Sequence, residues 1–450
     1  MFRTLANAWK VPELRKKLLY TLLLLVIFRF GAYVTAPGVD ASQLANLEGN
    51  TVVNTLNIIT GGAFSNLSIF AMSISPYITS SIVVQLLAFA IPSLERLSKE
   101  GGEEGRKKIT QYTRYGAVIL AAIEAFGFYA TYKQYGVFLS NGALTPLLFI
   151  LSLTAGSTFL MWLAEQITTR GIGNGTSLLI FAGIVSRLPN AAMYLYGLIV
   201  QNGVFNIKGL VISILVLISA IILIAGVVWV TEAERRVPVQ YAKRVVGRKM
   251  YGGQNTHIPM KLAMAGVMPV IFAMSFLQMP SMIIGLINHD IATSTGFWAG
   301  VYKVCAFTTI DASLIDSATG AFNWDILGYG LAHIFLYLLL IVGFTFFYTK
   351  FMAFNPIEVS NNLKKNGGFI PGIRAGKPTS DYLDSILNYI TTFGAIFLAI
   401  IAVLPILVQF TGLQLSFGGT AILIVVGVAL ESIKQLESQM LTRHYKGFLE

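Results

Sequence analysis

Three kinds of residue on which soluble proteins and enzymes rely are scarce in this sequence. Charged residues make up 12% of the chain, whereas a soluble domain carries roughly 25%. The single cysteine, Cys305, excludes a disulfide within the chain. The four histidines, His257, His289, His333 and His444, are too scattered to form the ligand spacing of a metal site. The sequence therefore predicts no disulfide, no metal site and no cofactor.

Enzymatic motifs are also missing. Gly101–Lys108 superficially resembles a phosphate-binding loop, but it lacks the G-x-x-x-x-G-K-[ST] order and follows an apolar run instead of a strand. A solvated loop is the better interpretation of this stretch. The chain contains no H-E-x-x-H or G-x-S-x-G motif and no nucleophile–base pair. We therefore expect a protein that is not an enzyme and that takes any energy it needs from a partner.

Apolar residues dominate instead: they make up 55% of the 450 residues, and the mean hydropathy is +0.69. A bilayer core needs about 20 mostly apolar residues per helix. The first apolar run follows Arg15–Lys17 and lacks a small-residue cleavage site, so we interpret it as a retained span. The ten candidate spans are Leu18–Val34, Leu67–Ile91, Arg114–Ala130, Pro146–Ile167, Ser177–Tyr196, Leu210–Val230, Leu262–Ile287, Leu327–Tyr348, Ile386–Gln409 and Gly418–Ser438.

The distribution of positive charge orients these spans. With the N-terminus inside, 27 of the 32 lysines and arginines fall in inner segments. The outer loops hold Lys133, Lys208 and Lys303, while Arg29 and Arg187 fall inside apolar runs. A one-span error would mix the two sets, so the pattern supports ten spans with both termini cytoplasmic.

Ten spans divide into five and five at the loop Gln201–Gly209. Because five is odd, the second half enters the membrane from the opposite side to the first. The predicted fold class is therefore an all-α polytopic membrane protein of two inverted five-helix halves, residues 1–208 and 209–450. Any central site or pore is expected at their interface.

Two long basic segments lie on the predicted inner side. Glu232–Lys261 has a net charge of +5 and Lys350–Asp381 a net charge of +3. Orientation alone favours positive charge here, but the segments are longer than a turn between spans requires. We therefore expect them to be docking surfaces. The candidate docking residues are Arg235, Arg236, Lys243, Arg244, Arg248, Lys249, Lys364, Lys365 and Arg374.

The second predicted span is unusually polar. Ser80, Ser81 and Gln85 interrupt it, and Pro76 removes one backbone donor. Such a helix matches lipid poorly and should face protein or water. Two interpretations stay open, namely a buried helix kinked at the proline and a helix that moves to open a path.

The segment Asn50–Asn66 precedes this span on the outer side. Its apolar stripe, with the i, i+4, i+7 spacing of a helix, consists of Val52, Leu56 and Ile59. Gly61 and Gly62 then permit a sharp turn. The segment is either a helix lying on the outer leaflet or a re-entrant piece packed inside the bundle.

Several stretches resemble the SecY family, the pore subunits of the bacterial protein translocon. They are Ser68–Ile78, Lys107–Tyr115, Phe159–Thr168, Gly171–Gly175, Asn362–Arg374 and Phe417–Thr420. The resemblance covers essentially the whole chain and matches ten spans in order. It implies an hourglass pore with an apolar ring at its waist. By position, that ring consists of Ile74, Ile78, Ile180, Ile271 and Ile424, with the polar Ser275 one turn beyond Ile271.

The same resemblance assigns roles to the other features. Asn50–Asn66 is similar to the plug that fills the outer funnel when the channel is closed. Spans two, three, seven and eight resemble a lateral gate, which Ser80, Ser81 and Gln85 could hold shut by hydrogen bonds. The basic segments resemble the docking surface for the ribosome, through its RNA phosphates, and for the motor ATPase SecA, with Arg374 matching the arginine on which motor-driven export depends. The resemblance also implies the small subunits SecE and SecG, signal sequences, nascent polypeptides and membrane lipids as partners.

The leading hypothesis is therefore a protein-conducting channel that passes unfolded secretory chains outward and releases hydrophobic segments sideways. A secondary transporter with inverted repeats is the alternative. It would use ionisable groups in mid-bilayer, for which Arg29 and Glu124 are the main candidates and Arg187 lies nearer a span end. An intramembrane enzyme, a third possibility, lacks a nucleophile–base pair.

Overall fold

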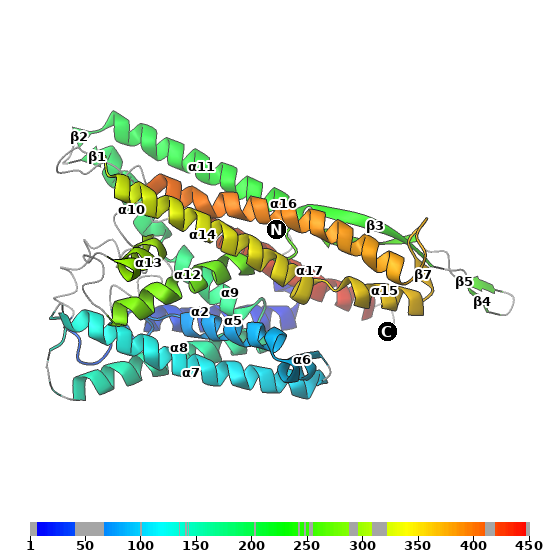
Figure 1. The fold of residues 1–450 in the computed structure, drawn as a ribbon, viewed down its shortest axis with the longest axis horizontal. Helices are drawn as coiled ribbons and strands as arrows, with labels where there is room; N and C mark the ends of the chain where they lie inside the picture. The colour runs from blue at the N-terminus through cyan, green and yellow to red at the C-terminus, as the bar shows by residue number, and fades with distance from the viewer. Residues whose placement is uncertain are drawn as a thin grey trace.

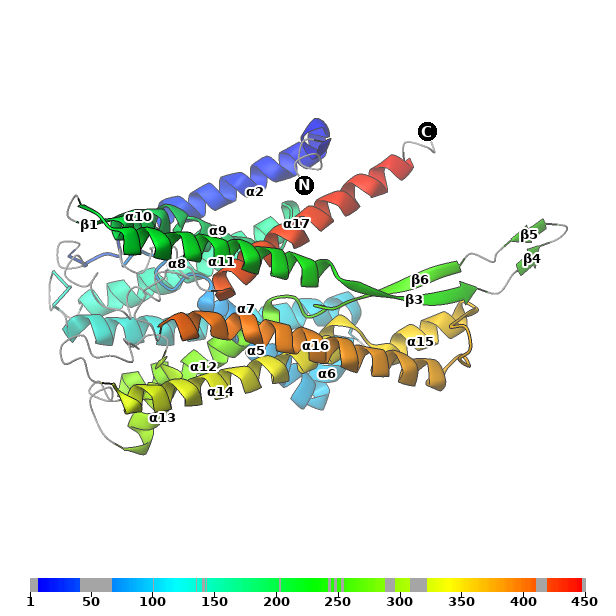
Figure 2. The same ribbon diagram turned by 90° about the horizontal axis from the view of Figure 1, so that it is seen from above.

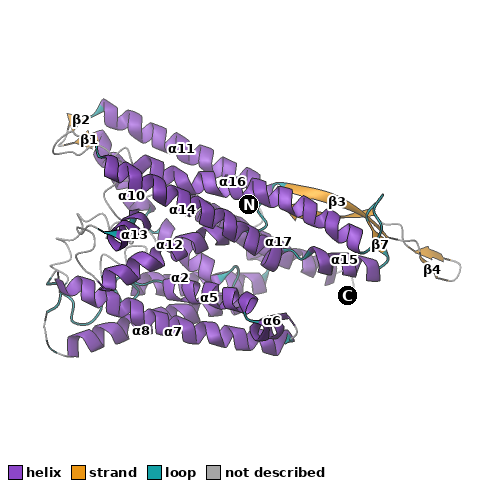
Figure 3. Cartoon of the chain, viewed as in Figure 1, coloured by secondary structure: helices purple, strands orange, loops and turns teal. Residues whose placement is uncertain are grey.

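The computed structural model describes residues 7–40, 67–99, 101–134, 136–139, 142, 144–201, 204–241, 244–246, 249–251, 255–287, 296–307, 322–409 and 419–446. Within these residues the chain is a bundle of long helices, with a narrow β-structure projecting from one end (Figure 1, Figure 3). The N-terminus of helix α2 (Pro12–Gly31) and the C-terminus of helix α17 (Gly419–Lys446) both lie toward the end of the bundle that carries the β-structure (Figure 2). We call it the hairpin end.

The elements follow one another in two sets. The helices of the first half are α2 (Pro12–Gly31), α5 (Ser75–Ala90), α6 (Pro92–Lys99), α7 (Gly102–Gln134), α8 (Leu144–Arg170), α9 (Gly175–Val185) and α10 (Leu188–Ile199). Those of the second half are α11 (Ile207–Glu232), α12 (Met268–Ile287), α13 (Phe297–Cys305), α14 (Trp324–Tyr348), the π-helix η4 (Thr349–Ala353), α15 (Pro356–Lys365), α16 (Lys377–Gln409) and α17 (Gly419–Lys446). The strands are β1 (Val200–Gln201), β2 (Val204–Phe205), β3 (Glu234–Tyr241), β4 (Arg244–Val246), β5 (Lys249–Tyr251), β6 (Asn255–Lys261) and β7 (Gly368–Phe369).

Helix length and composition support part of the predicted membrane topology. In the described residues, five helical stretches are long and apolar enough to cross a bilayer, namely Leu144–Arg170, Gly175–Ile199, Ile207–Glu232, Trp324–Lys365 and Lys377–Leu404. Two shorter apolar helical stretches accompany them, namely α5 (Ser75–Ala90) and the part Met268–Ser281 of α12. The count of ten spans stays a prediction.

The second predicted span, Leu67–Ile91, is helical only from Ser75 to Ala90. Before α5, the backbone turns through Leu67 (φ 38°) and Ser73 (φ 53°), and a right-handed helix cannot contain such residues. Pro76 occupies the first turn of α5, where a helix leaves its N–H groups unpaired in any case. Of the two interpretations left open for this span, a helix kinked at the proline is therefore wrong, because the helix begins there.

The fifth predicted span, Ser177–Tyr196, consists of two helices. α9 ends at Val185, and α10 begins at Leu188 with Pro189 in its first turn. A proline at that position starts a helix and interrupts the one before it. A hydropathy window does not detect the break, because both pieces are apolar.

The first basic segment forms a β-hairpin. Strand β3 pairs antiparallel with β6, from Glu234 opposite Lys261 to Gln240 opposite Asn255, and β7 pairs with the other edge of β3. Val237, on β3, is buried while its neighbour Arg236 is exposed, the alternation expected of a half-covered strand. The all-α prediction is therefore wrong in this respect, because the helices carry a three-stranded sheet in the order β6-β3-β7.

Candidate functional site

Five predicted isoleucines from both halves meet in one apolar cluster. Ile74, Ile180 and Ile424 are buried members of this cluster, and Ile78 and Ile271 pack against it. They come from the start of α5, from α9, from α12 and from α17, so residues 350 positions apart in the sequence lie together. We call these five residues the isoleucine cluster. Ser275, one turn further along α12, is partly exposed.

The backbone before α5 fixes the position of Ile74. Ile69 donates its N–H to the carbonyl of Val34 at 2.9 Å, and Ala36 donates to the carbonyl of Leu67 at the same distance. The segment is thereby tied to the chain just after α2. Ile74 is 1% exposed, so it lies within packed protein and not at the bundle surface.

A tight reversal between α8 and α9 positions Ile180. The Asn174 side chain accepts from the N–H groups of Thr176 (3.0 Å) and Ser177 (3.3 Å), which caps α9. At Gly175 a Cβ atom would overlap the carbonyl oxygen of Ala164, so the close approach of α9 to α8 requires glycine. The glycine-rich stretch singled out in the sequence therefore has a packing role.

A cavity of about 330 Å³ lies between the base of the β3–β6 hairpin and the isoleucine cluster. Ile271 and Ile424 line it, together with Asn174 and Ser177 from the first half. Its charged lining residues are Lys261, Glu431 and Lys434. The cavity is thus polar and charged where it meets the hairpin and apolar where it meets the cluster.

The charged groups near this cavity interact with one another. Lys434 Nζ lies 2.7 Å from Glu232 Oε1, which joins α17 to the end of α11. Partial burial, and then the positive charge of Lys434, hold the pKa of Lys261 below its ordinary value. The hydrogen bond from Arg236 lowers the pKa of the exposed Glu234. Both signs of charge therefore lie at the base of the β3–β6 hairpin.

The three predicted gate residues make hydrogen bonds within the first half. Ser80 Oγ donates to the carbonyl of Thr113 on α7 at 2.7 Å. Gln85 Nε2 donates to Ser81 Oγ at 3.0 Å, within α5. Among the described residues, neither bond reaches α12 or α14. We call the boundary between the helix pair α5–α7 of the first half and the pair α12–α14 of the second half the seam. Hydrogen bonds from these three side chains across the seam are therefore not found in the described part of the chain.

Aromatic contacts cross that seam instead. The Phe89 ring of α5 lies 5.6 Å, centroid to centroid, from Phe347 of α14 and 4.4 Å from Phe351 of η4. Sequence reasoning did not identify these residues. The sequence feature that could have identified them is an aromatic residue near the predicted inner end of the second span and another near that of the eighth, two spans expected to be neighbours in the gate.

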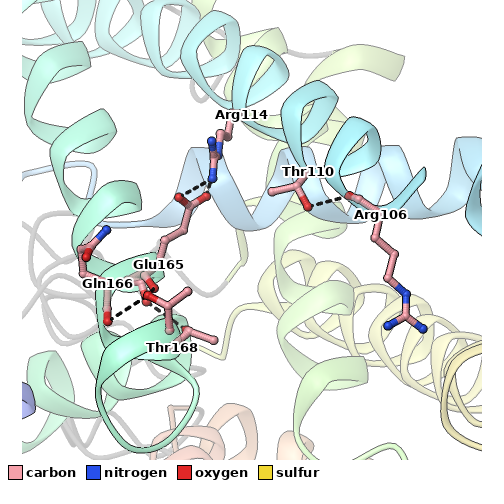
Figure 4. Close-up of polar contacts among 8 residues, drawn as sticks. Arg106, Thr110, Arg114, Glu165, Gln166 and Thr168 are labelled. Atoms are coloured by element: carbon pink, nitrogen blue, oxygen red, sulfur yellow. Dashed lines mark hydrogen bonds and ion pairs between the residues drawn. The ribbon is translucent and has the colours of Figure 1, made fainter. Parts of the chain in front are cut away.

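A bidentate ion pair links α7 to α8. Arg114 Nε and Nη2 each donate to a carboxylate oxygen of Glu165 at 2.8 Å, and the two side chains point directly toward each other (Figure 4). Such a pair fixes orientation as well as distance. In the sequence, Arg114 marked the start of the third predicted span and lay in one of the stretches that resemble the SecY family, and its pairing with Glu165 was not predicted.

The two basic segments form one surface. Pairing of Gln240 with Phe369 brings β7 against β3, so the segment that carries Arg374 lies beside the hairpin. The Thr379 hydroxyl donates to the Arg374 carbonyl at 2.9 Å, and that of Ser360 donates to the Gly376 carbonyl at 2.7 Å. The exposed docking candidates with described side chains are Arg235, Arg236, Lys364, Lys365 and Arg374.

Other predicted residues lie wholly or partly outside the described part of the chain. Of Arg244 and Lys249 only the backbone is described, in β4 and β5. The docking candidates Lys243 and Arg248 and the plug candidates Val52, Leu56, Ile59, Gly61 and Gly62 lie outside the described residues.

Comparison with known proteins agrees with this architecture. The SecY family model matches residues 68–433. The protein translocase subunits SecY of Halalkalibacterium halodurans (42% identity over 461 residues) and Streptomyces coelicolor (43% over 467) are similar over 100% of both chains. A solved structure described as that of a protein conducting channel has a TM-score of 0.66 at 20% identity, covering 95% of this chain and 92% of its own. Sec61 from a canine ribosome–channel complex has a TM-score of 0.62 at 19% identity, with the same coverage. This chain belongs to the SecY family.

Proposed function

We propose that this chain is the channel-forming subunit of a protein translocase. It passes unfolded secretory chains across the membrane and releases hydrophobic segments sideways into the bilayer. The observation that carries the proposal is the isoleucine cluster, which is assembled from both halves at the apolar end of a cavity. Membership of the SecY family and the fold shared with a protein conducting channel support it.

The chemistry of the isoleucine cluster suits a constriction that blocks ions when closed and opens around a polypeptide. Branched aliphatic side chains offer no hydrogen bonds to water, so a narrow ring of them dewets and blocks ions. The same side chains can move apart around a sliding polypeptide without breaking any polar bond. The cluster therefore serves as the waist of an hourglass pore, with Ser275 adding one polar group beside it.

Sideways release uses the seam, with α5 and α7 on one side of it and α12 and α14 on the other. An apolar segment that enters this seam replaces contacts between helices with contacts of its own, and it then passes into the lipid beyond. Ser80 keeps α5 on α7 through its bond to Thr113, so the two helices move together. The segment Asn50–Asn66 acts as the plug of the closed channel.

The basic surface supplies the connection to an energy source. Arg235, Arg236, Lys364 and Lys365 suit ribosomal RNA phosphates, whose binding weakens as salt rises. Arg374, exposed on a turn held by two side-chain hydrogen bonds, engages the motor ATPase SecA. SecE and SecG complete the complex in the bacterial cell membrane, and both termini of this chain are cytoplasmic.

Cross-linking to a stalled secretory chain tests the pore. A photoreactive residue at Ile271 or Ile78 should cross-link to a precursor arrested in transit. Ile221 on α11 is the matched control, because it is an isoleucine of a long apolar helix but is 66% exposed at the bundle surface. If the precursor never cross-links at Ile271 or Ile78 while a small solute is transported, the chain is a transporter and not a protein channel.

A further inference from the structure

Three phenylalanines meet at the C-terminal ends of α5 and α14. Phe89 lies in the last turn of α5, Phe347 in the last turn of α14, and Phe351 in the π-helix η4. Phe89 meets Phe347 edge to face (87°), and Phe347 lies 5.3 Å from Phe351. With the 4.4 Å separation of Phe89 and Phe351, the three rings contact one another in a closed triangle.

Contacts on either side of the triangle show that it joins two separate units. On α12 and α14, Phe272 lies 6.1 Å from Phe344, and Phe276 lies 5.9 Å from the same ring. These helices are therefore held together by their own aromatic pairs. α5 is held to α7 by the bond from Ser80 to Thr113. Phe89 thus reaches from one bonded helix pair to the other.

The second-half side of the triangle is fixed in place. Phe354 donates its N–H to the carbonyl of Thr349 at 3.1 Å, the five-residue step of a π-helix. Thr349 is 2% exposed, and Lys350 Nζ lies 3.6 Å from Asp384 Oδ1 on α16. Phe351 therefore projects from a turn anchored on two sides. A π-turn at the end of a long helix is an irregularity that often marks functional sites.

We propose that Phe89, Phe347 and Phe351 form an aromatic latch that holds the seam shut. This inference rests on the proposed function, because it names the residues that oppose sideways opening. The three are positioning residues, since they keep α5 and α14 together and need not touch the moving chain in the pore. Truncating Phe89 removes two aromatic pairs, each worth roughly 2- to 13-fold in an equilibrium constant. The expected change in the ratio of open to closed seam is about 5- to 150-fold.

The chain offers a matched control for this test. Phe276 is 48% exposed and Phe89 is 49% exposed, and each makes one edge-on ring contact from a helix at the seam. The difference is that the partner of Phe276, Phe344, belongs to the same half. Phe89→Ala and Phe276→Ala therefore remove similar aromatic surface, but only the first removes a contact between the halves.

The experiment measures transport of two precursors by the intact complex in vesicles. One precursor has a full-length apolar signal segment, and the other has the same segment shortened. The latch predicts that Phe89→Ala and Phe351→Ala each raise transport of the shortened precursor several-fold relative to the full one. It also predicts that the free-energy effect of the double variant Phe89→Ala with Phe351→Ala is smaller than the sum of the two single effects. The reason is that both single changes remove the same contact, the one between Phe89 and Phe351.

The control settles the outcome. Phe276→Ala should leave the ratio of the two precursors unchanged, and Phe89→Leu should lie between alanine and wild type. An equal shift in Phe276→Ala, or full additivity of Phe89→Ala with Phe351→Ala, would overturn the latch. Failure of the wild-type complex to move the full-length precursor would instead refute the proposed function, so the two failures are distinguishable.

Discussion

Replacing Gly156 with alanine tests whether the segment before α5 is packed as the structure has it. A Cβ atom at Gly156, on α8, would overlap the carbonyl oxygen of Ile69 and lie 2.9 Å from its carbonyl carbon. Both atoms belong to backbone, so no rotation of a side chain can make room. The segment itself is tied to the chain after α2 by the bond from the Ile69 N–H to Val34. Insertion of one methyl group must therefore displace buried backbone.

The size of the effect follows from comparison with an open site. At Gly226, within α11, an added Cβ atom would meet no neighbouring atom within 4 Å. Alanine in a helix interior is favoured over glycine by about 1 kcal/mol, and this gain applies at both sites. Overpacking a tight interior costs about 1–3 kcal/mol, and it applies only at Gly156. We therefore expect Gly156→Ala to be about 1–3 kcal/mol less stable than Gly226→Ala.

The assay is the free energy of unfolding of both variants in one mixed-micelle system, with ion leakage of reconstituted vesicles as a second readout. Because Ile69 lies five residues before Ile74, displacement of this backbone should also loosen the isoleucine cluster and raise the leak. Gly226→Ala should leave the leak unchanged. Equal stability of the two variants would refute the packing described for Leu67–Ile74.

Three further changes probe other parts of the molecule. Arg374→Glu should abolish motor-driven export while the fold stays intact, with Arg374→Lys retaining part of the rate; normal export by Arg374→Glu would refute the assigned role. Deletion of Thr51–Thr60 should raise ion conductance of resting vesicles, and an unchanged leak would remove the plug assignment. Glu165→Gln should lower the free energy of unfolding by about 0.2–1 kcal/mol because the Arg114 partner is partly exposed. The exchanged pair Arg114→Glu with Glu165→Arg should recover most of that loss, and no recovery would argue against a direct pair.

The sequence predicted the long helices better than it predicted their breaks. The sixth span, predicted at Leu210–Val230, is the helix Ile207–Glu232, because hydropathy and helicity coincide along it. Hydropathy and helicity do not coincide in Leu67–Ile74, which is mostly apolar and almost fully buried but is not helical. Hydropathy reports burial in lipid or protein, and it does not report backbone conformation.

The site was less accessible to sequence reasoning than the fold. Ile180 is 6% exposed in the isoleucine cluster, whereas Ile221 is 66% exposed on α11, yet both are isoleucines within long apolar runs. Nothing local distinguishes them, so resemblance to a family was needed to select the five. The contact of Phe89 with Phe351 was missed for a related reason, since its partner lies 262 positions away.

The sequence also made docking and conduction look separate, because the basic segments and the isoleucines lie far apart along the chain. In the structure α17 joins them. Its residue Ile424 belongs to the cluster, and Lys434, ten residues on and so about 15 Å along the helix, pairs with Glu232 at the base of the hairpin. Five residues further on, Gln439 accepts a hydrogen bond from Lys17 of α2 at 3.2 Å. α17 is thus one continuous helix that contacts the isoleucine cluster, the hairpin base and α2, so it is the element through which a displacement at the hairpin base can reach the other two.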